Sequence, residues 1–168
     1  MYEDERWPSA PDSSPQSICD HDEYEISIEI GSDLWSGTDD EVKVRFYFLD
    51  GSVTEWFNLN QPMFNDFERL STNYFCVKPQ QGKRLQTPVF IGIRKFGRDR
   101  MKIEGIAVWT KMSSSLFDVG QWIRSDNEYR FGSRTICKDQ RCILVLWSVK
   151  VKKLLQKRYC SFYETKSR

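Results

Sequence analysis

The sequence contains a single histidine and no Cys-x-x-Cys pair. Because the lone His21 stands in an acidic segment, the spacing of ligands that binds a structural zinc ion is absent. The Gly-x-Ser-x-Gly motif of serine hydrolases is absent too. No apolar run approaches the roughly 18 residues that a membrane-spanning helix needs. These absences argue against a zinc protein, a serine hydrolase of that type and a helical membrane span.

Acidic and basic residues nearly balance, with a formal net charge of +1, but they are unevenly distributed. This small charge gives no general attraction to nucleic acid. Residues 1–22 are rich in Pro, Ser and acidic residues without periodicity, which is typical of a flexible tail. The stretch from Lys150 to Arg158 is basic, as in a solvated terminal segment. We therefore predict one domain over residues 23–151, between an acidic tail (1–22) and a basic tail (152–168).

The first residues, Met1-Tyr2-Glu3-Asp4-Glu5-Arg6, lack the basic and then apolar profile of a signal peptide. We therefore expect a cytoplasmic protein that is peripheral to a membrane, or a secreted one if the true start is missing.

The five cysteines leave the redox compartment open. Cys137 and Cys142 are close enough in sequence to close a short hairpin as a disulfide, and Cys19 could be bonded to Cys160 between the two tails. Because five is odd, at least one thiol stays free or pairs between molecules. Cys76 stands inside a strand-like run, so we predict that it is the free one.

Apolar and polar residues alternate along most of the central sequence. In residues 24–30, Tyr24 and three isoleucines alternate with Glu25, Ser27 and Glu29, which indicates a strand with one buried face. Turn signals such as Asp50-Gly51 separate the runs. The same reasoning predicts strands over residues 42–48, 89–93, 101–108 and 142–151, and shorter ones over 55–59, 74–77 and 116–123. Many short strands without a long helical period predict an all-β protein, a sandwich or a barrel.

Two loop motifs make the prediction more specific. The first is Gly31-Ser32-Asp33-Leu34-Trp35-Ser36-Gly37-Thr38-Asp39-Asp40, and the second is Pro62-Met63-Phe64-Asn65-Asp66-Phe67-Glu68-Arg69. In this order and between strands, they resemble the PLAT domain, above all the N-terminal domain of animal lipoxygenases. The resemblance covers roughly residues 24–123. It implies an antiparallel β-sandwich of two four-stranded sheets that carries no catalytic group, so we expect that this chain is not an enzyme.

The acidic residues of these loops suggest a calcium site. Calcium takes six to eight oxygen ligands, and Asp39, Asp40, Asp66 and Glu68 would bring several carboxylates together if the loops meet. The resemblance points to the same groups, with further oxygens from Gly37 and Asn65 and an acid before the sixth strand, where Asp99 stands between two arginines. The alternative is that Asp39 and Asp66 cap turns through backbone amides. Phe67 is predicted to anchor its loop in the core.

Trp35 is the strongest candidate for a lipid contact. It stands in a turn-rich segment with no obvious packing partner, and an indole suits the headgroup zone of a bilayer. One such side chain is too weak an anchor alone, so Phe64 or Phe96 or a calcium bridge would have to assist. The alternative is that Trp35 folds back onto the edge of the sandwich.

Three functions remain open at this stage. The first is a non-catalytic module that docks on a membrane or lipid surface with the help of Ca²⁺. The second is a protein-binding module of the same fold, and the third is a regulatory part of a larger lipase or lipoxygenase. None of the three involves nucleic acid.

Overall fold

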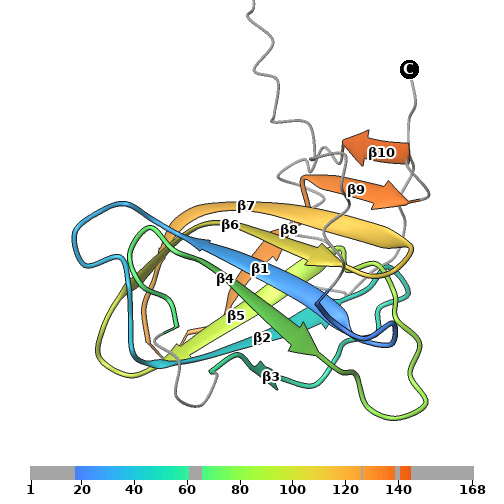
Figure 1. Ribbon diagram of the computed structural model, residues 1–168, viewed down its shortest axis with the longest axis horizontal. Coiled ribbons are helices and arrows are strands. Elements are labelled where there is room, and N and C mark those ends of the chain that lie inside the picture. Colours follow the sequence, from blue (N-terminus) through green and yellow to red (C-terminus); the bar gives the residue numbers. More distant parts are fainter. Residues whose placement is uncertain (1–17, 61–65, 126, 139–140, 145–168) are drawn as a thin grey trace, which may run out of the picture.

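A computed structural model of the chain describes residues 18–60, 66–125, 127–138 and 141–144, and these form two packed antiparallel sheets (Figure 1). The larger sheet has the strand order β10-β9-β7-β6-β1-β4, and the smaller has the order β3-β2-β5-β8. The strands are β1 (Tyr24–Ile30), β2 (Glu41–Tyr47), β3 (Phe57–Asn58), β4 (Thr72–Val77), β5 (Phe90–Phe96), β6 (Met101–Trp109), β7 (Ser113–Ile123), β8 (Tyr129–Gly132), β9 (Thr135–Lys138) and β10 (Arg141–Leu144).

The predicted all-β sandwich is confirmed, but the two sheets are not equal. Four strands, β7-β6-β1-β4, form one layer, and β9 and β10 extend the same sheet beyond them. The extension exists because β7 is 11 residues long, and its first residues pair with β9 while its other edge pairs with β6. Strands β8 and β9, of four residues each, were not predicted from the alternation pattern.

The core lies between the two layers, as the alternation in the sequence predicts. Ile26 and Ile28 of β1 and Val44 of β2 are completely buried, and their neighbours in sequence are partly exposed. Phe67 is 1% exposed and stacks on Phe75 with 5.4 Å between ring centroids, so its predicted role as the anchor of its loop is confirmed.

A cluster of charged and aromatic groups links β8, the edge strand of the small sheet, to β2 across the intervening strand β5. Glu128 accepts hydrogen bonds from Arg45, Arg130 and the hydroxyl of Tyr47. Burial raises the pKa of the Glu128 carboxyl, but the bonds from Arg130, Tyr47 and Arg45 outweigh burial and lower it to about 2. Gly92 lies beneath this cluster, where a Cβ would be 2.9 Å from Oε1 of Glu128.

A disulfide bond joins Cys19 to Cys76, so the prediction that Cys76 is the free thiol was wrong, and so was a bond from Cys19 to Cys160. The reason is the alternation of side chains along β4. Phe75 and Val77 face the core, and Cys76 between them therefore points outward, where Cys19 can reach it. Cys137 is also disulfide-bonded, and its register partner in the β9–β10 hairpin is Cys142, the pair expected from the sequence.

The Cys19–Cys76 bond shows that residues 18–22 are attached to the sandwich, although the sequence assigned them to the acidic tail. The rest of that tail, the basic tail (152–168) and Cys160 lie outside the described residues. Within the described residues, no helix is long and apolar enough to cross a membrane.

The Cys19–Cys76 bond should contribute to the stability of the domain. In the chain-entropy account, a cross-link over 57 residues removes enough freedom from the unfolded chain to stabilise the native state by about 4 kcal/mol. We expect the double variant Cys19→Ser, Cys76→Ser to lose about 2–4 kcal/mol of unfolding free energy in urea denaturation. Reduction of the wild type should lower the unfolding free energy at least as much, because it also breaks the bond of Cys137. An unchanged urea midpoint in the double variant would contradict the prediction.

Candidate functional site

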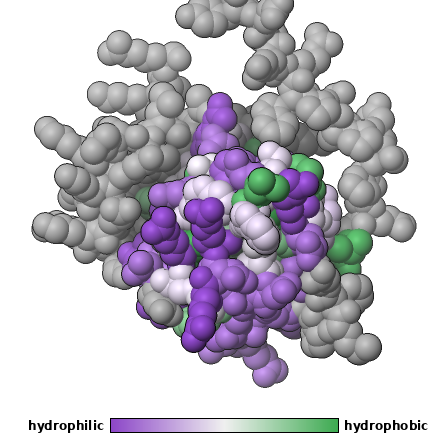
Figure 2. All heavy atoms as spheres, turned by 90° about the vertical axis from the view of Figure 1, so that its left-hand side faces the viewer, coloured by the Kyte–Doolittle hydropathy of each residue, from purple (hydrophilic) through white to green (hydrophobic). Residues whose placement is uncertain are grey.

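Three loops gather at one end of the sandwich, which we call the loop end: residues 31–40 between β1 and β2, residues 66–71 before β4, and residues 97–100 between β5 and β6. They meet because β1 and β5 end here and β2, β4 and β6 begin here, as the antiparallel registers require. Figure 2 views this end and shows a mainly hydrophilic face with small apolar areas among the polar ones.

The first two loops touch at Gly37. A Cβ on Gly37 would lie 2.7 Å from the carbonyl oxygen of Phe67 and 3.0 Å from the amide nitrogen of Arg69, so only glycine fits there. The backbone N–H of the next residue, Thr38, donates to the same Phe67 carbonyl at 3.1 Å. The two motifs recognised in the sequence are therefore in direct backbone contact.

The segment before Gly37 is held against β6. Gly31 N–H donates to the carbonyl of Lys102, and Lys102 N–H donates in turn to the carbonyl of Ser36. The hydroxyl of the fully buried Ser36 donates to the carbonyl of Gly31 at 2.5 Å, which closes the loop on itself. The ammonium group of Lys102 binds Asp33 and Glu104. A loop anchored at both ends projects its central residues outward.

Those central residues are apolar and exposed. Trp35 is 80% exposed and Leu34 is 72% exposed, so Trp35 does not fold back onto the sandwich. Trp35 has a φ of 65°, a conformation that residues other than glycine seldom adopt. Leu70, 66% exposed, is close to the same loop because its N–H donates to the carbonyl of Gly31. We call Leu34, Trp35 and Leu70 the apolar tip.

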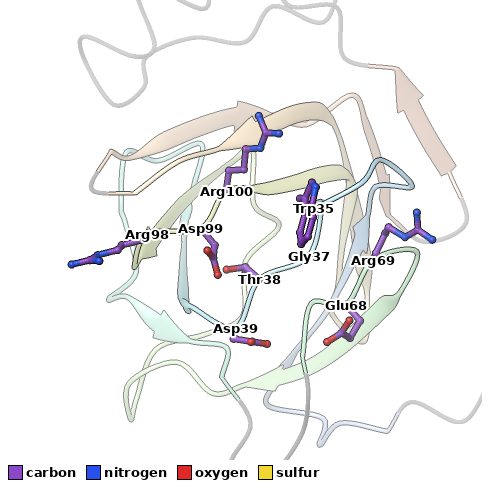
Figure 3. A pocket seen from close by; sticks show the side chains of 9 residues that line it. All are labelled: Trp35, Gly37, Thr38, Asp39, Glu68, Arg69, Arg98, Asp99 and Arg100. Carbon is purple, nitrogen blue, oxygen red and sulfur yellow. The ribbon is translucent and has the colours of Figure 1, made fainter.

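Beside the tip is an open pocket of about 730 Å³, which is lined by residues from all three loops. In Figure 3 the carboxyl groups of Asp39, Glu68 and Asp99 border a common space, while the guanidinium groups of Arg69 and Arg98 point away from it. The lining residues are Trp35, Gly37, Thr38, Asp39, Glu68, Arg69, Arg98, Asp99 and Arg100. The structure thus brings together four of the predicted metal-binding residues: Gly37, Asp39, Glu68 and Asp99.

Asp40, predicted as a fifth ligand, has a structural partner instead. Its carboxylate binds the ammonium group of Lys95, a residue with no exposed surface, and also accepts the N–H of Asp99 at 2.9 Å. Burial raises the pKa of the Asp40 carboxyl, but the hydrogen bond and charge of Lys95 outweigh burial and hold it below its usual range. Asp40 thus neutralises a buried cation, and it is not among the residues that line the pocket.

The other predicted residues are not part of the pocket lining that the structure describes. Asp66 is half-buried in the second loop and does not line the pocket. Phe96 is half-buried, with the ammonium group of Lys43 5.1 Å from its ring centroid, so its ring is already in contact with a neighbouring strand. Phe64 and Asn65 lie outside the described residues.

The sequence reasoning missed two members of the apolar tip and one cation at the pocket. Leu34 could have been found, since a leucine directly before Trp35 in a turn-rich segment has no more packing surface than Trp35 itself. Arg69 ends the second motif and Leu70 follows it, but their position depends on the contact between the loops, which no local pattern reveals.

The donor set in the pocket fits a hard cation such as calcium. Three carboxylates and the carbonyl groups of the surrounding loops are oxygen ligands of the kind that calcium takes. The carboxylates are spread out: within the described residues, one group of three candidate ligand atoms lies within 4.8 Å of each other, and it is Cys19, Glu23 and Cys76, whose sulfurs form the disulfide. An ion in the pocket would therefore need water or another molecule to complete its shell.

No protein-family profile and no curated protein sequence matches this chain. Solved structures do match it. The coral 8R-lipoxygenase, described as activated by calcium through a C2-like domain, aligns with a TM-score of 0.58 and 16% identity over 66% of this chain. The fold is that of a PLAT domain. A calcium-dependent 11R-lipoxygenase aligns with a TM-score of 0.53 and 17% identity over 80% of this chain, and the alpha-toxin of Clostridium absonum with 0.54 and 20% over 66%.

The chain matches only a part of each of these proteins. It spans 17% of the coral lipoxygenase, 20% of the 11R-lipoxygenase and 31% of the alpha-toxin. The resemblance to the PLAT domain is thereby confirmed at the level of the fold.

Two neighbouring aspartates should respond differently to mutation. Asp40→Asn leaves the buried ammonium group of Lys95 without its counter-charge, and we expect it to lower the unfolding free energy by about 3–5 kcal/mol. Asp39→Asn changes an exposed side chain and should alter stability by less than about 0.5 kcal/mol. Thermal denaturation measured by circular dichroism distinguishes the two. Equal melting temperatures for both variants would show that the Lys95–Asp40 pair is not structural.

Proposed function

We propose that this chain is a non-catalytic module that docks on a lipid surface through its loop end, assisted by calcium. The observation that carries the proposal is the exposed apolar tip beside a pocket lined with carboxylates. An exposed tryptophan and two exposed leucines on anchored loops do not belong to the core of the sandwich. Their exposure is instead what insertion into the headgroup zone requires.

The size of the tip sets the strength of the contact. Burying one large apolar side chain is worth about 1.5–3 kcal/mol. A tryptophan and a neighbouring leucine together thus supply several kcal/mol, which supports reversible docking.

Calcium would bind in the pocket through Asp39, Glu68 and Asp99, with oxygens of the loop backbone. The three acidic residues are matched in number by Arg69, Arg98 and Arg100, which weakens the attraction for a cation. The effect is reduced because Arg69 and Arg98 point away from the pocket and because Arg100 stacks on Trp122 at 4.5 Å. We therefore expect weak binding, in the range of about 10⁻⁴ to 10⁻³ M that is typical of extracellular modules.

The disulfide bonds favour an oxidising compartment. Cys19–Cys76 and the bonded Cys137 are of the kind found in secreted proteins and rare in the cytosol. We therefore prefer the secreted alternative to the cytoplasmic one, with millimolar calcium available to a weak site.

A second candidate function is a regulatory role within a larger enzyme. The specific observation in its favour is that the matched lipoxygenases and alpha-toxin carry this fold as a small share of longer chains. Under this hypothesis the module would bring a catalytic domain to its lipid substrate, and the loop end would serve the same docking purpose.

Vesicle sedimentation tests the proposal. The wild type should sediment with phosphatidylcholine–phosphatidylserine vesicles in millimolar calcium and much less with chelator. Trp35→Ala should keep the wild-type melting temperature, because the side chain is 80% exposed, and weaken vesicle binding by about tenfold to a hundredfold.

The matched control is Leu49→Ala, which removes an exposed apolar side chain beyond the opposite end of β2. It should leave vesicle binding unchanged. Two results count against the proposal: equal binding with calcium and chelator would remove the role of calcium, and equal binding by Trp35→Ala and wild type would remove the role of the tip.

A further inference from the structure

The end of the sandwich opposite to the loop end carries a second hollow, of about 740 Å³. The loops that line it are on the right-hand side of Figure 1. At this end β4, β6 and β9 end and β1, β5 and β7 begin. It is lined by residues 83–87 of the β4–β5 loop, residues 110–113 at the β6–β7 turn, Lys138 at the end of β9, and His21 and Asp22 before β1. We call it the basic hollow.

Four cations line the basic hollow: Lys83, Arg84, Lys111 and Lys138, all exposed. Within the part of the chain that the structure describes, none of the four forms an ion pair, whereas Lys43, Arg45, Lys78, Lys95, Lys102, Arg130 and Arg134 all do. The one acidic residue in the lining, Asp22, binds Lys78 at 2.6 Å. The positive charge of the hollow is therefore concentrated and not neutralised by its own walls.

Three hydroxyl groups lie in the wall of the same space and are hydrogen-bonded to one another. Thr87 donates to the hydroxyl of Ser113 at 2.8 Å, and Ser113 and Thr110 share a hydrogen bond of 2.9 Å. The donors that are open to a ligand are lysine ammonium groups and an arginine fork, which are groups that recognise tetrahedral oxyanions. A volume of about 740 Å³ exceeds one such group and lies in the range of sites for small molecules.

We propose that the basic hollow is a binding site for a sulfate or phosphate ester of about the size of a sugar. Lys83, Lys111 and Lys138 supply point charges, and Arg84 supplies a bidentate fork. The ligand comes from the aqueous phase, because a module that docks by its apolar tip turns this opposite end away from the lipid surface. That last step depends on the proposed function, but the charge and shape of the hollow do not.

Calorimetric titration at low salt tests the site with defined probes: inorganic phosphate, a sulfated disaccharide derived from heparin, inositol hexakisphosphate, and the desulfated disaccharide. We expect binding of the sulfated sugar or of the inositol phosphate, and the stronger of the two identifies the source of the oxyanion. The desulfated sugar should not bind.

The decisive variant is Lys111→Gln with Lys138→Gln, because both side chains are exposed and their removal leaves the fold intact. It should weaken binding of the preferred probe by at least about tenfold, as expected for two lost charged contacts. The matched control is Arg98→Gln with Arg124→Gln, which removes the same charge at the loop end and should bind the probe as the wild type does.

Three results would overturn the proposal. The first is the absence of binding to any of the charged probes. The second is equal weakening of probe binding by the two double variants, because the loss would then follow from the net charge of the protein and not from the hollow. The third is loss of vesicle binding in Lys111→Gln, Lys138→Gln while Trp35→Ala still binds vesicles, since the hollow would then be the face that meets the lipid.

Discussion

The ammonium group of Lys95 is completely buried, and its neutralisation by Asp40 determines the arrangement of the loop end. An unpaired charge in the interior is too costly to keep, so the β1–β2 loop must bring a carboxylate to this point. The same carboxylate accepts the N–H of Asp99 and thereby fixes the β5–β6 loop. Gly97 is required beside it, because a Cβ would overlap Oδ1 of Asp40 at 1.8 Å, and its φ of 135° suits glycine. One ion pair thus positions two of the three loops.

The third loop is positioned by apolar packing rather than by charge. Phe67 enters the core with a φ of 61° and stacks on Phe75, and its carbonyl accepts the N–H of Thr38. The loop fixed by the ion pair and the loop fixed by Phe67 therefore touch at Gly37, where no side chain separates their backbones. The pocket and the apolar tip are consequences of this double anchoring, which explains how exposed leucines and a tryptophan can be held outside the core.

Most of the sandwich could be predicted because alternation is a local signal. The strands from 24–30 and 42–48 follow directly from it, and Phe67 was recognised as an anchor from its place inside a polar loop. Other features depend on contacts that are distant in sequence. The pairing of Asp40 with Lys95 joins residues that are 55 positions apart in the sequence. The inward direction of Lys95 itself follows from the alternation along β5, because Ile91 and Ile93 on the same face are buried. Alternation along β4 likewise places Cys76 on the outer face of its sheet. Strands β8 and β9 are too short to show a period, and they form because β5 and β7 offer free edges to pair with.

The length of the strands has a consequence for how the two ends work together. Strand β1 has seven residues, which at about 3.4 Å per residue separates the loop end from the basic hollow by about 24 Å. The Debye length in physiological salt is about 8 Å, so the potential of a charged surface at one end decays almost completely before it reaches the other. The sandwich therefore acts as a spacer that is longer than the distance over which salt screens charge. A ligand at either end interacts mainly with the charges of that end. A single small domain can therefore bind two charged partners whose electrostatic fields do not affect each other.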